Sequence, residues 1–443
     1  MFLDANDVKA LTDKILLRSK AEGCVVKIEG GEDNSLRFAR GVATTNLTTS
    51  DLRLRISSHM GGRIGSVSTT QTDDDSLVVA VKRSEELAAM LPVDPDYTPP
   101  LGPQDYEAPQ RFHHQPAAMQ LDALAGMAGR AIAESAQSDV NVFGCANSAL
   151  RFEALATSAG LFAYEPRSEI DLSVTARNLA DTWSGWAGAH DYNATRHDAQ
   201  EIARHACKKA AWDVTPVDLE PGAYTVILEP EATAELAYWL LSAMDARAAE
   251  EGRSFFSKAG GGSLIGEALF DPRLTLRIDP GDLLAPEGTF DYEGLPHRPR
   301  AFIDKGVATI LHRSRVWAQK TKTEPIASGQ NFIVDGGATT RDEMIRSTKR
   351  GVLVTRLWYT NMVEPKSLLL TGLTRDGNFL IENGRIVAPT RNMRFNQRIG
   401  DLFARLIAVG PTERTWRAAG DGAPAAPPIM VDGFNFSSKS SGI

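Results

Sequence analysis

Residues 357–396 read LWYTNMVEPKSLLLTGLTRDGNFLIENGRIVAPTRNMRFN, and this stretch decides the fold of the second half of the chain. Apolar runs in it are separated by Gly372 and by two dipeptides, Asp376-Gly377 and Asn383-Gly384. Two-residue hairpin turns need residues that tolerate a positive φ, and Asp-Gly and Asn-Gly are their most common sequences. The stretch therefore predicts a meander of antiparallel strands held in a fixed register.

The sequence around this meander predicts more strands and a few helices. Residues 224–228 (YTVIL) indicate a buried strand, which Pro230 ends. Residues 231–251 predict one long helix, whose apolar positions recur at helical spacing. Shorter helices are expected at 340–350 and 399–409, with strands at 274–278 and 301–311. We therefore expect a mostly antiparallel β domain with a few helices over residues 220–443.

The first half of the chain predicts a duplicated unit. A helix, a strand, the motif N-S-(A)-L-R-F, further strands and a second helix occur twice, with the motif at 34–38 and at 147–152. A chance repeat of a short motif is the alternative. The predicted repeats cover about 1–92 and 110–212, within an N-terminal domain of residues 1–215. The whole chain is thus predicted to be an α+β protein of two domains.

Bulk composition excludes several classes of protein. The 443 residues carry a net charge of −8 with acids and bases interspersed, which argues against a protein that binds nucleic acid by neutralising phosphates. Three widely separated cysteines cannot build a disulfide framework and suit a reducing compartment. The N-terminus does not resemble a secretory signal, and no run of about 18 apolar residues occurs. We expect a cytoplasmic protein that binds neither nucleic acid nor membrane.

Tests for common catalytic motifs leave one weak candidate. The chain has neither a GxSxG elbow nor an SxxK pair, and its Gly260-Gly261-Gly262 run does not fit a phosphate-binding motif. His190-Asp191 and His197-Asp198 form the only cluster with plausible metal ligands. An ordinary surface pair is the simpler interpretation of these residues.

Five short segments, in this order, resemble the TldD/PmbA family, the two related subunits of a bacterial zinc metallopeptidase. The segments are Glu287-Gly288, 303–307 (IDKGV), 328–337, 371–377 (TGLTRDG) and 379–384 (FLIENG). None of them is a catalytic motif alone. The resemblance covers most of the chain and implies the family's fold.

The resemblance also implies that this chain has no metal site. Zinc-bearing subunits of the family carry a His-Glu-x-x-x-His helix, whereas no histidine of this chain is followed by glutamate. The matching run, VILEPEATAELAYWLLSA, places Tyr238, Trp239 and Ala243 near the positions of the two histidines and the glutamate. The family's further cysteine ligand has no counterpart in the C-terminal VDGFNFSSKSSGI. We therefore expect no catalytic residue, no metal ligand and no cofactor in this chain, with zinc in a partner subunit.

The implied function is that of the TldE/PmbA-type subunit. Such a subunit forms a heterodimer with a TldD-like zinc-bearing subunit, and the pair trims or degrades unfolded and leader peptides. A homodimer is one possibility when that partner is absent, and the sequence does not decide the oligomeric state of the isolated chain. Two segments are candidates for contact with the peptide or the partner, although both also read as ordinary loops. Their residues are Ser254, Phe255, Phe256, Gly260, Arg375, Asp376 and Asn378.

Two other functions stay open at this point. One is a stand-alone hydrolase that uses His190, Asp191 and His197 as atypical metal ligands. The other is a regulatory protein that binds a topoisomerase such as gyrase, or a toxin–antitoxin pair, without proteolysis.

Overall fold

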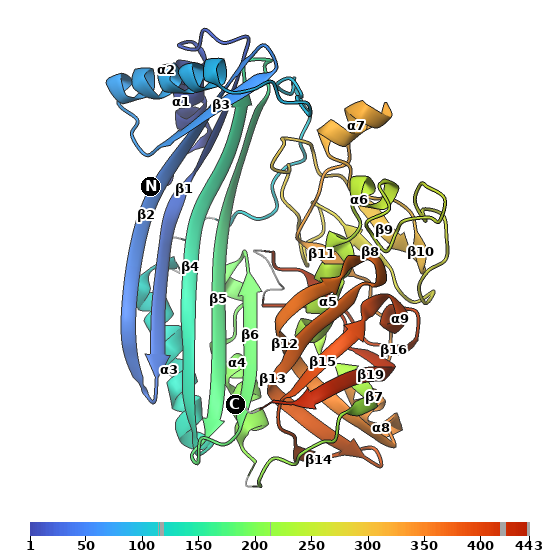
Figure 1. Cartoon of the computed structure of the whole chain (residues 1–443). Coiled ribbons are helices and arrows are strands. Elements are labelled where there is room, and N and C mark those ends of the chain that lie inside the picture. The colour runs from blue at the N-terminus through green and yellow to red at the C-terminus, as the bar shows by residue number, and fades with distance from the viewer. Residues whose placement is uncertain (114, 116–118, 213, 417–421, 441–443) are drawn as a thin grey trace.

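The computed structural model describes residues 1–113, 115, 119–212, 214–416 and 422–440. The chain forms two parts that lie side by side: a long, curved antiparallel sheet with its helices, and a second part rich in short strands (Figure 1). The predicted α+β fold of two domains is confirmed. The boundary proposed between residues 215 and 220 falls between the last helix of the first part and the first strand of the second.

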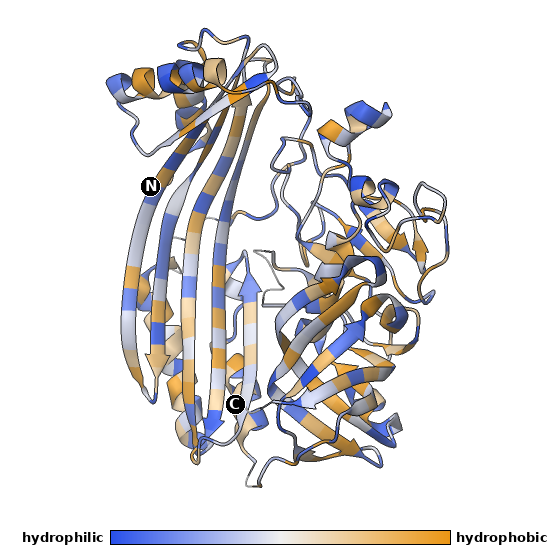
Figure 2. Ribbon diagram, viewed as in Figure 1, coloured by the Kyte–Doolittle hydropathy of each residue, from blue (hydrophilic) through white to orange (hydrophobic). Residues whose placement is uncertain are grey.

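The first part is a six-stranded sheet in the order β3-β2-β1-β4-β5-β6, in which every neighbouring pair is antiparallel. Polar and apolar residues alternate along its long strands (Figure 2), as expected for a sheet with one covered face. The strands are β1 (Gly23–Ala39), β2 (Val42–Met60), β3 (Arg63–Thr69), β4 (Val140–Thr157), β5 (Phe162–Asn178) and β6 (Ser184–Asp191). The helices are α1 (Ala5–Leu16), α2 (Asp74–Met90), α3 (Leu121–Gln137) and α4 (Ala199–Ala210).

The predicted duplication is confirmed. Each half of this part has the order helix, three strands, helix: α1-β1-β2-β3-α2 and then α3-β4-β5-β6-α4. The two halves join through β1 and β4, where Asn34 lies opposite Ser148 and Ser35 opposite Asn147. The Ser35 hydroxyl donates to Asn147 Oδ1 at 2.7 Å. The two copies of the repeated motif therefore meet at the pseudo-twofold centre of the sheet.

The second part contains two sheets. In the larger, β12 pairs with both β7 and β13, so that β12, β7, β19, β15 and β13 form a closed ring of strands. Its strands are β7 (Gly222–Leu228), β12 (Arg350–Glu364), β13 (Leu369–Glu382), β14 (Arg385–Pro389), β15 (Met393–Arg398), β16 (Leu406–Val409) and β19 (Ile429–Lys439). The smaller sheet has the order β10-β9-β8-β11-β18-β17. Its strands are β8 (Leu276–Ile278), β9 (Arg300–Asp304), β10 (Val307–Ala308), β11 (Phe332–Val334), β17 (Glu413–Arg414) and β18 (Ala425–Ala426).

The meander is present, but only one of its predicted turns is a hairpin. Asn383-Gly384, with φ of 50° and 78°, turns β13 into β14 as predicted. Asp376-Gly377 instead lies inside β13, where a bulge shifts the register against β12 between Val354 and Arg356. A bulge needs the same positive φ as a hairpin turn, so the dipeptide alone does not distinguish them. Gly372 also lies within β13, opposite Phe395. The chain turns from β12 to β13 through the 3-10 turn η3 (Pro365–Ser367).

Five helices lie among the described residues of the second part. They are α5 (Pro230–Ser242), α6 (Ala246–Glu250), α7 (Arg315–Thr321), α8 (Arg341–Ser347) and α9 (Ile399–Phe403). Two of the predicted helices differ from them, and α7 lies where no helix was predicted. The single helix predicted over 231–251 is broken, because Asp245 accepts a hydrogen bond from Ala248 N and starts α6 as a new helix. The helix predicted over 399–409 ends at Phe403, and its second half is β16.

The two parts share an apolar contact. Trp183, just before β6, packs edge-on against Phe379 of β13 with ring centroids 5.5 Å apart, and Met344 of α8 belongs to the same buried cluster. The main core of the second part surrounds α5, which lies among its sheets. In the described ranges of the chain, no helix is both long and apolar enough to cross a membrane.

Candidate functional site

Helix α5 is where the resemblance would place a metal site. The buried strand β7 leads into it, and Pro230 stands at its start, where a missing N–H costs nothing. Tyr238 and Trp239 pack edge-on against each other with ring centroids 5.7 Å apart. Tyr238 lines a small pocket of about 110 Å³ with apolar neighbours such as Leu241 and Phe302. This environment favours packing over ligation.

The residues near α5 do not fit a zinc site. The helix itself, PEATAELAYWLLS, contains neither histidine nor cysteine. The pocket beside it contains His312, whose Nδ1 lies 2.6 Å from the carbonyl oxygen of Ile326, and Asp245, which caps α6. Among the residues described, no group of three or more His, Cys, Asp or Glu side chains is placed to hold a metal ion. A zinc site needs three or four such ligands in tetrahedral geometry.

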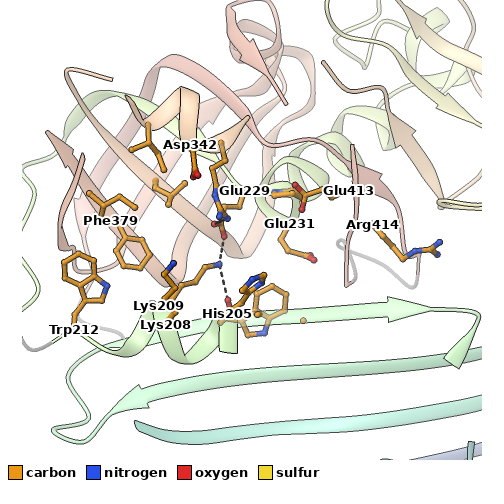
Figure 3. A pocket seen from close by; sticks show the side chains of 18 residues that line it. His205, Lys208, Lys209, Trp212, Glu229, Glu231, Asp342, Phe379, Glu413 and Arg414 are labelled. Carbon is orange, nitrogen blue, oxygen red and sulfur yellow. Dashed lines mark hydrogen bonds and ion pairs between the residues drawn. The ribbon is translucent and has the colours of Figure 1, made fainter. Parts of the chain in front are cut away.

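A larger cavity of about 350 Å³ lies where the two parts of the molecule meet (Figure 3). β6 and α4 of the first part form one side of it. The starts of α5 and α8, with β12, β13 and β14, form the other. Its lining residues are Trp186, Ala187, Gly188, His205, Lys208, Lys209, Trp212, Glu229, Pro230, Glu231, Arg341, Asp342, Ile345, Leu353, Phe379, Ile386, Glu413 and Arg414. We call it the interdomain cavity.

A buried carboxylate forms the centre of the interdomain cavity. Lys209 Nζ lies 2.5 Å from Glu229 Oε2, and the Arg341 guanidinium lies 2.9 Å from Glu229 Oε1. Lys209 and Glu229 point toward each other in Figure 3. Burial opposes the ionisation of Glu229, but the two cations outweigh it and lower the pKa of its carboxyl below the ordinary value. The ion pairs join α4 of the first part to the start of α5 in the second.

Two further titratable groups of the interdomain cavity have pKa values shifted toward the neutral form. Burial raises the pKa of Glu413. Burial lowers the pKa of His205, and the nearby Lys209 and Arg341 lower it further. The described lining includes no serine, threonine or cysteine, so it offers no hydroxyl or thiol nucleophile. The lining combines charged side chains with aromatic and aliphatic ones, and its volume falls in the range of about 300–1,000 Å³ that is typical of small-molecule sites.

A second ion-pair cluster connects the two parts beside this cavity. Asp376 accepts a hydrogen bond of 2.9 Å from the Ser184 hydroxyl of β6 and lies 2.9 Å from the Arg356 guanidinium. That guanidinium lies over Trp186 and Trp358, at 4.8 and 5.2 Å from the ring centroids. The positive φ of the bulge in β13 therefore places the Asp376 carboxylate against the first part.

The predicted contact residues of the loop 254–263 are mostly internal. Ser254 is buried and its hydroxyl donates to the carbonyl oxygen of Ala243 at 3.0 Å. Phe256 is fully buried, and Phe255 is half-buried beside it, with ring centroids 5.3 Å apart. Gly260 is exposed with a φ of +88°. Contact by this loop stays a prediction, and its exposed tip is the part that a second molecule can reach.

The predicted contact residues at 375–378 lie next to the interdomain cavity. Asn378 is buried and donates to Asn392 Oδ1 at 2.7 Å, and Asp376 is held as described above. Arg375 is half-buried over the Trp358 ring, 5.4 Å from its centroid. The structure does not bring this segment and the loop 254–263 into one described cavity. Contact with a partner or peptide by these residues also stays a prediction.

The candidate ligands at 190–197 are engaged by other groups. The Asp191 carboxylate lies 3.2 Å from the Arg414 guanidinium and 3.8 Å from that of Arg196. His197 Nε2 lies 2.9 Å from the carbonyl oxygen of Ile170, and burial lowers the pKa of its imidazole. His190 is buried with its ring edge-on to Tyr192. In the described part of the chain, these residues do not belong to a group of three or more His, Cys, Asp or Glu side chains placed to hold a metal ion.

Sequence reasoning missed the buried polar network around Arg111. The Arg111 Nε–H donates to Glu165 Oε1 at 2.7 Å, and the backbone N–H of Thr289 donates to Glu165 Oε2 at 2.7 Å. The Glu165 carboxylate of β5 thus joins Arg111, from the segment between α2 and α3, to Thr289 of the second part. No local signal reveals this, because Arg111 follows a proline-rich segment that reads as exposed. The position of Glu229 was easier to predict from the sequence, because this residue directly precedes Pro230, where α5 begins.

Two family models match the sequence. The model described as the PmbA/TldA metallopeptidase C-terminal domain matches residues 221–438. The model described as PmbA/TldA metallopeptidase domain 1 matches residues 24–88. No curated protein sequence matches the chain significantly.

Solved structures share the fold over nearly the whole chain. TldE from Thermococcus kodakarensis is 17% identical, with a TM-score of 0.83, over 98% of this chain and 99% of that one. A candidate modulator of DNA gyrase from Bacteroides thetaiotaomicron is 20% identical, with a TM-score of 0.84, over 99% and 100%. One from Thermotoga maritima is 16% identical, with a TM-score of 0.82, over 96% and 99%. At these identities, the likeness establishes the fold.

Proposed function

Because this chain belongs to the PmbA/TldD family of metallopeptidases, we propose that it is the metal-free, TldE-like subunit of a two-chain zinc peptidase. A TldD-like partner supplies the zinc and the hydrolytic chemistry. The pair processes or degrades unfolded and leader peptides in the cytoplasm. This chain contributes one wall of the peptide-binding space.

The composition of α5 carries this proposal. A zinc hydrolase needs several ligands, an open position for water and a general base. In this chain the corresponding helix offers Tyr238, Trp239 and Ala243, which have aromatic and methyl side chains. The fold is that of the family, yet the helix has neither histidine nor cysteine, and the described residues include no group of three or more His, Cys, Asp or Glu placed to hold a metal ion. Such a chain is functional only together with a related chain that has them.

The interdomain cavity gives the chain a role beyond that of a scaffold. A peptide has a polar main chain and variable side chains, so a general peptide site combines apolar walls with a few charges. Trp186, Trp212 and Phe379 provide such walls around the Glu229 carboxylate. We propose that part of the substrate peptide enters this cavity while the partner cleaves it.

Reconstitution with the partner tests the proposal. The purified chain is expected to contain no stoichiometric zinc by mass spectrometry and to cleave no unstructured peptide. Addition of the TldD-like chain is expected to give a complex and peptide cleavage that a chelator abolishes. Cleavage by the lone chain after exhaustive chelation would refute the proposal. A lone chain that binds a regulatory protein, with no cleavage in any combination, would favour the regulatory alternative.

A pair of matched variants tests the role of the interdomain cavity. Ile386→Trp fills the cavity from β14, whereas the exposed neighbour Val387 points to the opposite face of that strand. In the reconstituted complex, Ile386→Trp is expected to raise the KM for peptides at least several-fold, and Val387→Trp is expected to leave it unchanged. Equal effects of the two variants would contradict the proposed contact.

A further inference from the structure

The outer edge of β2 is unpaired over most of its length. β2 pairs with β1 along Val42–Met60, but β3 covers its other side only from Leu54 to Met60. Residues 42–53 therefore lie at an open edge, which Figure 1 shows at the outer side of the long sheet. At 3.3 Å per residue, this edge is about 40 Å long. It presents a row of unpaired backbone N–H and C=O groups.

The rest of the molecule does not cover this edge. The opposite edge of the sheet, β6, packs against the second part of the chain, where Ser184 binds Asp376. Helix α3 covers the apolar side chains of β1 in the same region, including Leu36 and Phe38. Residues 42–51 are exposed on both faces, with Val42 and Leu47 exposed by 59% and 57%.

The central residues of this edge, 45–50, lack the usual protection against pairing. Natural edge strands carry charged residues, proline or bulges that prevent another strand from adding. Residues 41–50, GVATTNLTTS, include no charged residue, histidine or proline, and their one irregularity is a bulge at Thr44, between the pairs Ala43–Phe38 and Thr45–Arg37. Residues 45–53 of β2 follow a regular register. Residues 41–50 are rich in threonine, which favours strands. An exposed edge whose central residues, 45–50, are uncharged and regular is suited to strand addition.

We propose that β2 pairs with β2 of a second copy of this chain, antiparallel about a twofold axis at Leu47. The sequence is self-complementary in that register, because Thr45 faces Thr49, and Asn46 faces Thr48. Threonine pairs across antiparallel strands are favourable, and no like charges lie directly opposite each other in this register. A twofold interface needs one surface that is complementary to itself. The proposal covers both the homodimer of the lone chain and the surface that forms it, and it does not depend on the peptidase role.

Charge substitution at the axis tests the pairing in the full-length chain. Sedimentation and light scattering are expected to find a dimer at micromolar concentrations. Leu47→Lys and Leu47→Glu each place two like charges opposite each other, and both variants are expected to be monomeric. An equimolar mixture of the two is expected to dimerise again, because lysine then faces glutamate. Leu283→Lys, at a leucine of similar exposure (61%) elsewhere, is the matched control and is expected to stay dimeric.

Several results would overturn the proposal. They are a monomeric wild-type chain, dimers of both Leu47 variants, or a mixture that stays monomeric. Hydrogen exchange of the wild-type chain gives an independent measurement that needs no variant. Slow exchange at residues 42–50 that becomes fast on dilution is expected, whereas fast exchange at all concentrations would contradict the pairing. Activity with a zinc-bearing partner is not measured here, so the two proposals can fail separately.

Discussion

Glu229 is the residue on which the interdomain cavity depends. A carboxylate at this depth is unfavourable alone, because burial removes its hydration. Lys209 from α4 and Arg341 from α8 restore a favourable environment from two different parts of the chain. Removing one partner of a buried ion pair destabilises the fold by more than the intact pair stabilises it, because the remaining charge is still buried and now lacks its partner.

The first prediction concerns Lys209→Met. Because Arg341 remains, we expect a loss of about 2 kcal/mol in the free energy of unfolding near neutral pH. The folded state lowers the pKa of Glu229 from its ordinary value of 4.5. The ion pairs therefore stabilise the fold above that value, and this stabilisation is lost as the pH falls through the folded-state pKa. The difference between wild type and variant is expected to shrink on acidification, as measured by urea denaturation.

Lys208→Met is the control for this prediction. Lys208 lines the same cavity and is exposed, and no ion pair of its side chain is found in the described part of the chain. Its substitution is expected to change stability by less than about 0.5 kcal/mol at any pH. A pH-independent loss at Lys209 would show that packing, and not charge, explains the effect.

At the scale of elements, the bulge in β13 decides how the two parts fit together. It turns Asp376 toward Ser184, and it depends on Gly377, whose φ is +128°. A Cβ atom at Gly377 would lie 2.5 Å from Thr355 Oγ1. Both the conformation and the space therefore require glycine at this position.

The second prediction compares two glycine substitutions in strands. Gly377→Ala is expected to cost about 3 kcal/mol or more, because strain and a steric clash add. Gly433→Ala, at a φ of +74° with no atom within 4 Å of the added Cβ, is expected to cost only about 1 kcal/mol. Thermal and urea unfolding measure both. Similar costs for the two variants would mean that the bulge does not constrain the fold.

Local sequence patterns predicted the helices and strands better than the connections and breaks between them. The repeated order of helix, strands and helix in the first half and the Asn383-Gly384 turn depend on neighbouring residues alone, so the sequence was sufficient for them. The break after α5 contains neither glycine nor proline, and the N-capping Asp245 was its only signal. Whether Asp376-Gly377 forms a turn or a bulge depends on whether β12 continues alongside it, which local sequence does not contain.

The candidate site was harder to predict, because its contacts are distant in sequence. Glu229 meets a lysine 20 residues before it and an arginine 112 residues after it. Arg111 and Glu165 are 54 residues apart. Hydrophobic periodicity contains no information on such pairs. That α5 contains neither histidine nor cysteine can, by contrast, be read from the residues of one helix.

At the scale of the whole molecule, Arg111 and Glu165 are expected to couple the two parts. Both side chains are largely buried, with exposures of 15% and 4%. The third prediction is that Arg111→Met destabilises the protein by about 3 kcal/mol, because it leaves the Glu165 carboxylate buried without its cation. The double variant Arg111→Met/Glu165→Gln is expected to recover part of this loss. If calorimetry finds that the losses in stability from the two substitutions simply add in the double variant, the coupling between Arg111 and Glu165 is contradicted.

The account of the whole molecule is that this chain provides structure and peptide contacts while another chain provides the chemistry. One measurement tests that claim most directly. The reconstituted complex is prepared with wild-type copies of this chain and with a partner whose His-Glu-x-x-x-His glutamate is replaced by glutamine. We expect a complex of unchanged mass that cleaves no peptide. Cleavage that persists in this complex would contradict the account, because this chain would then have to supply the catalytic groups itself.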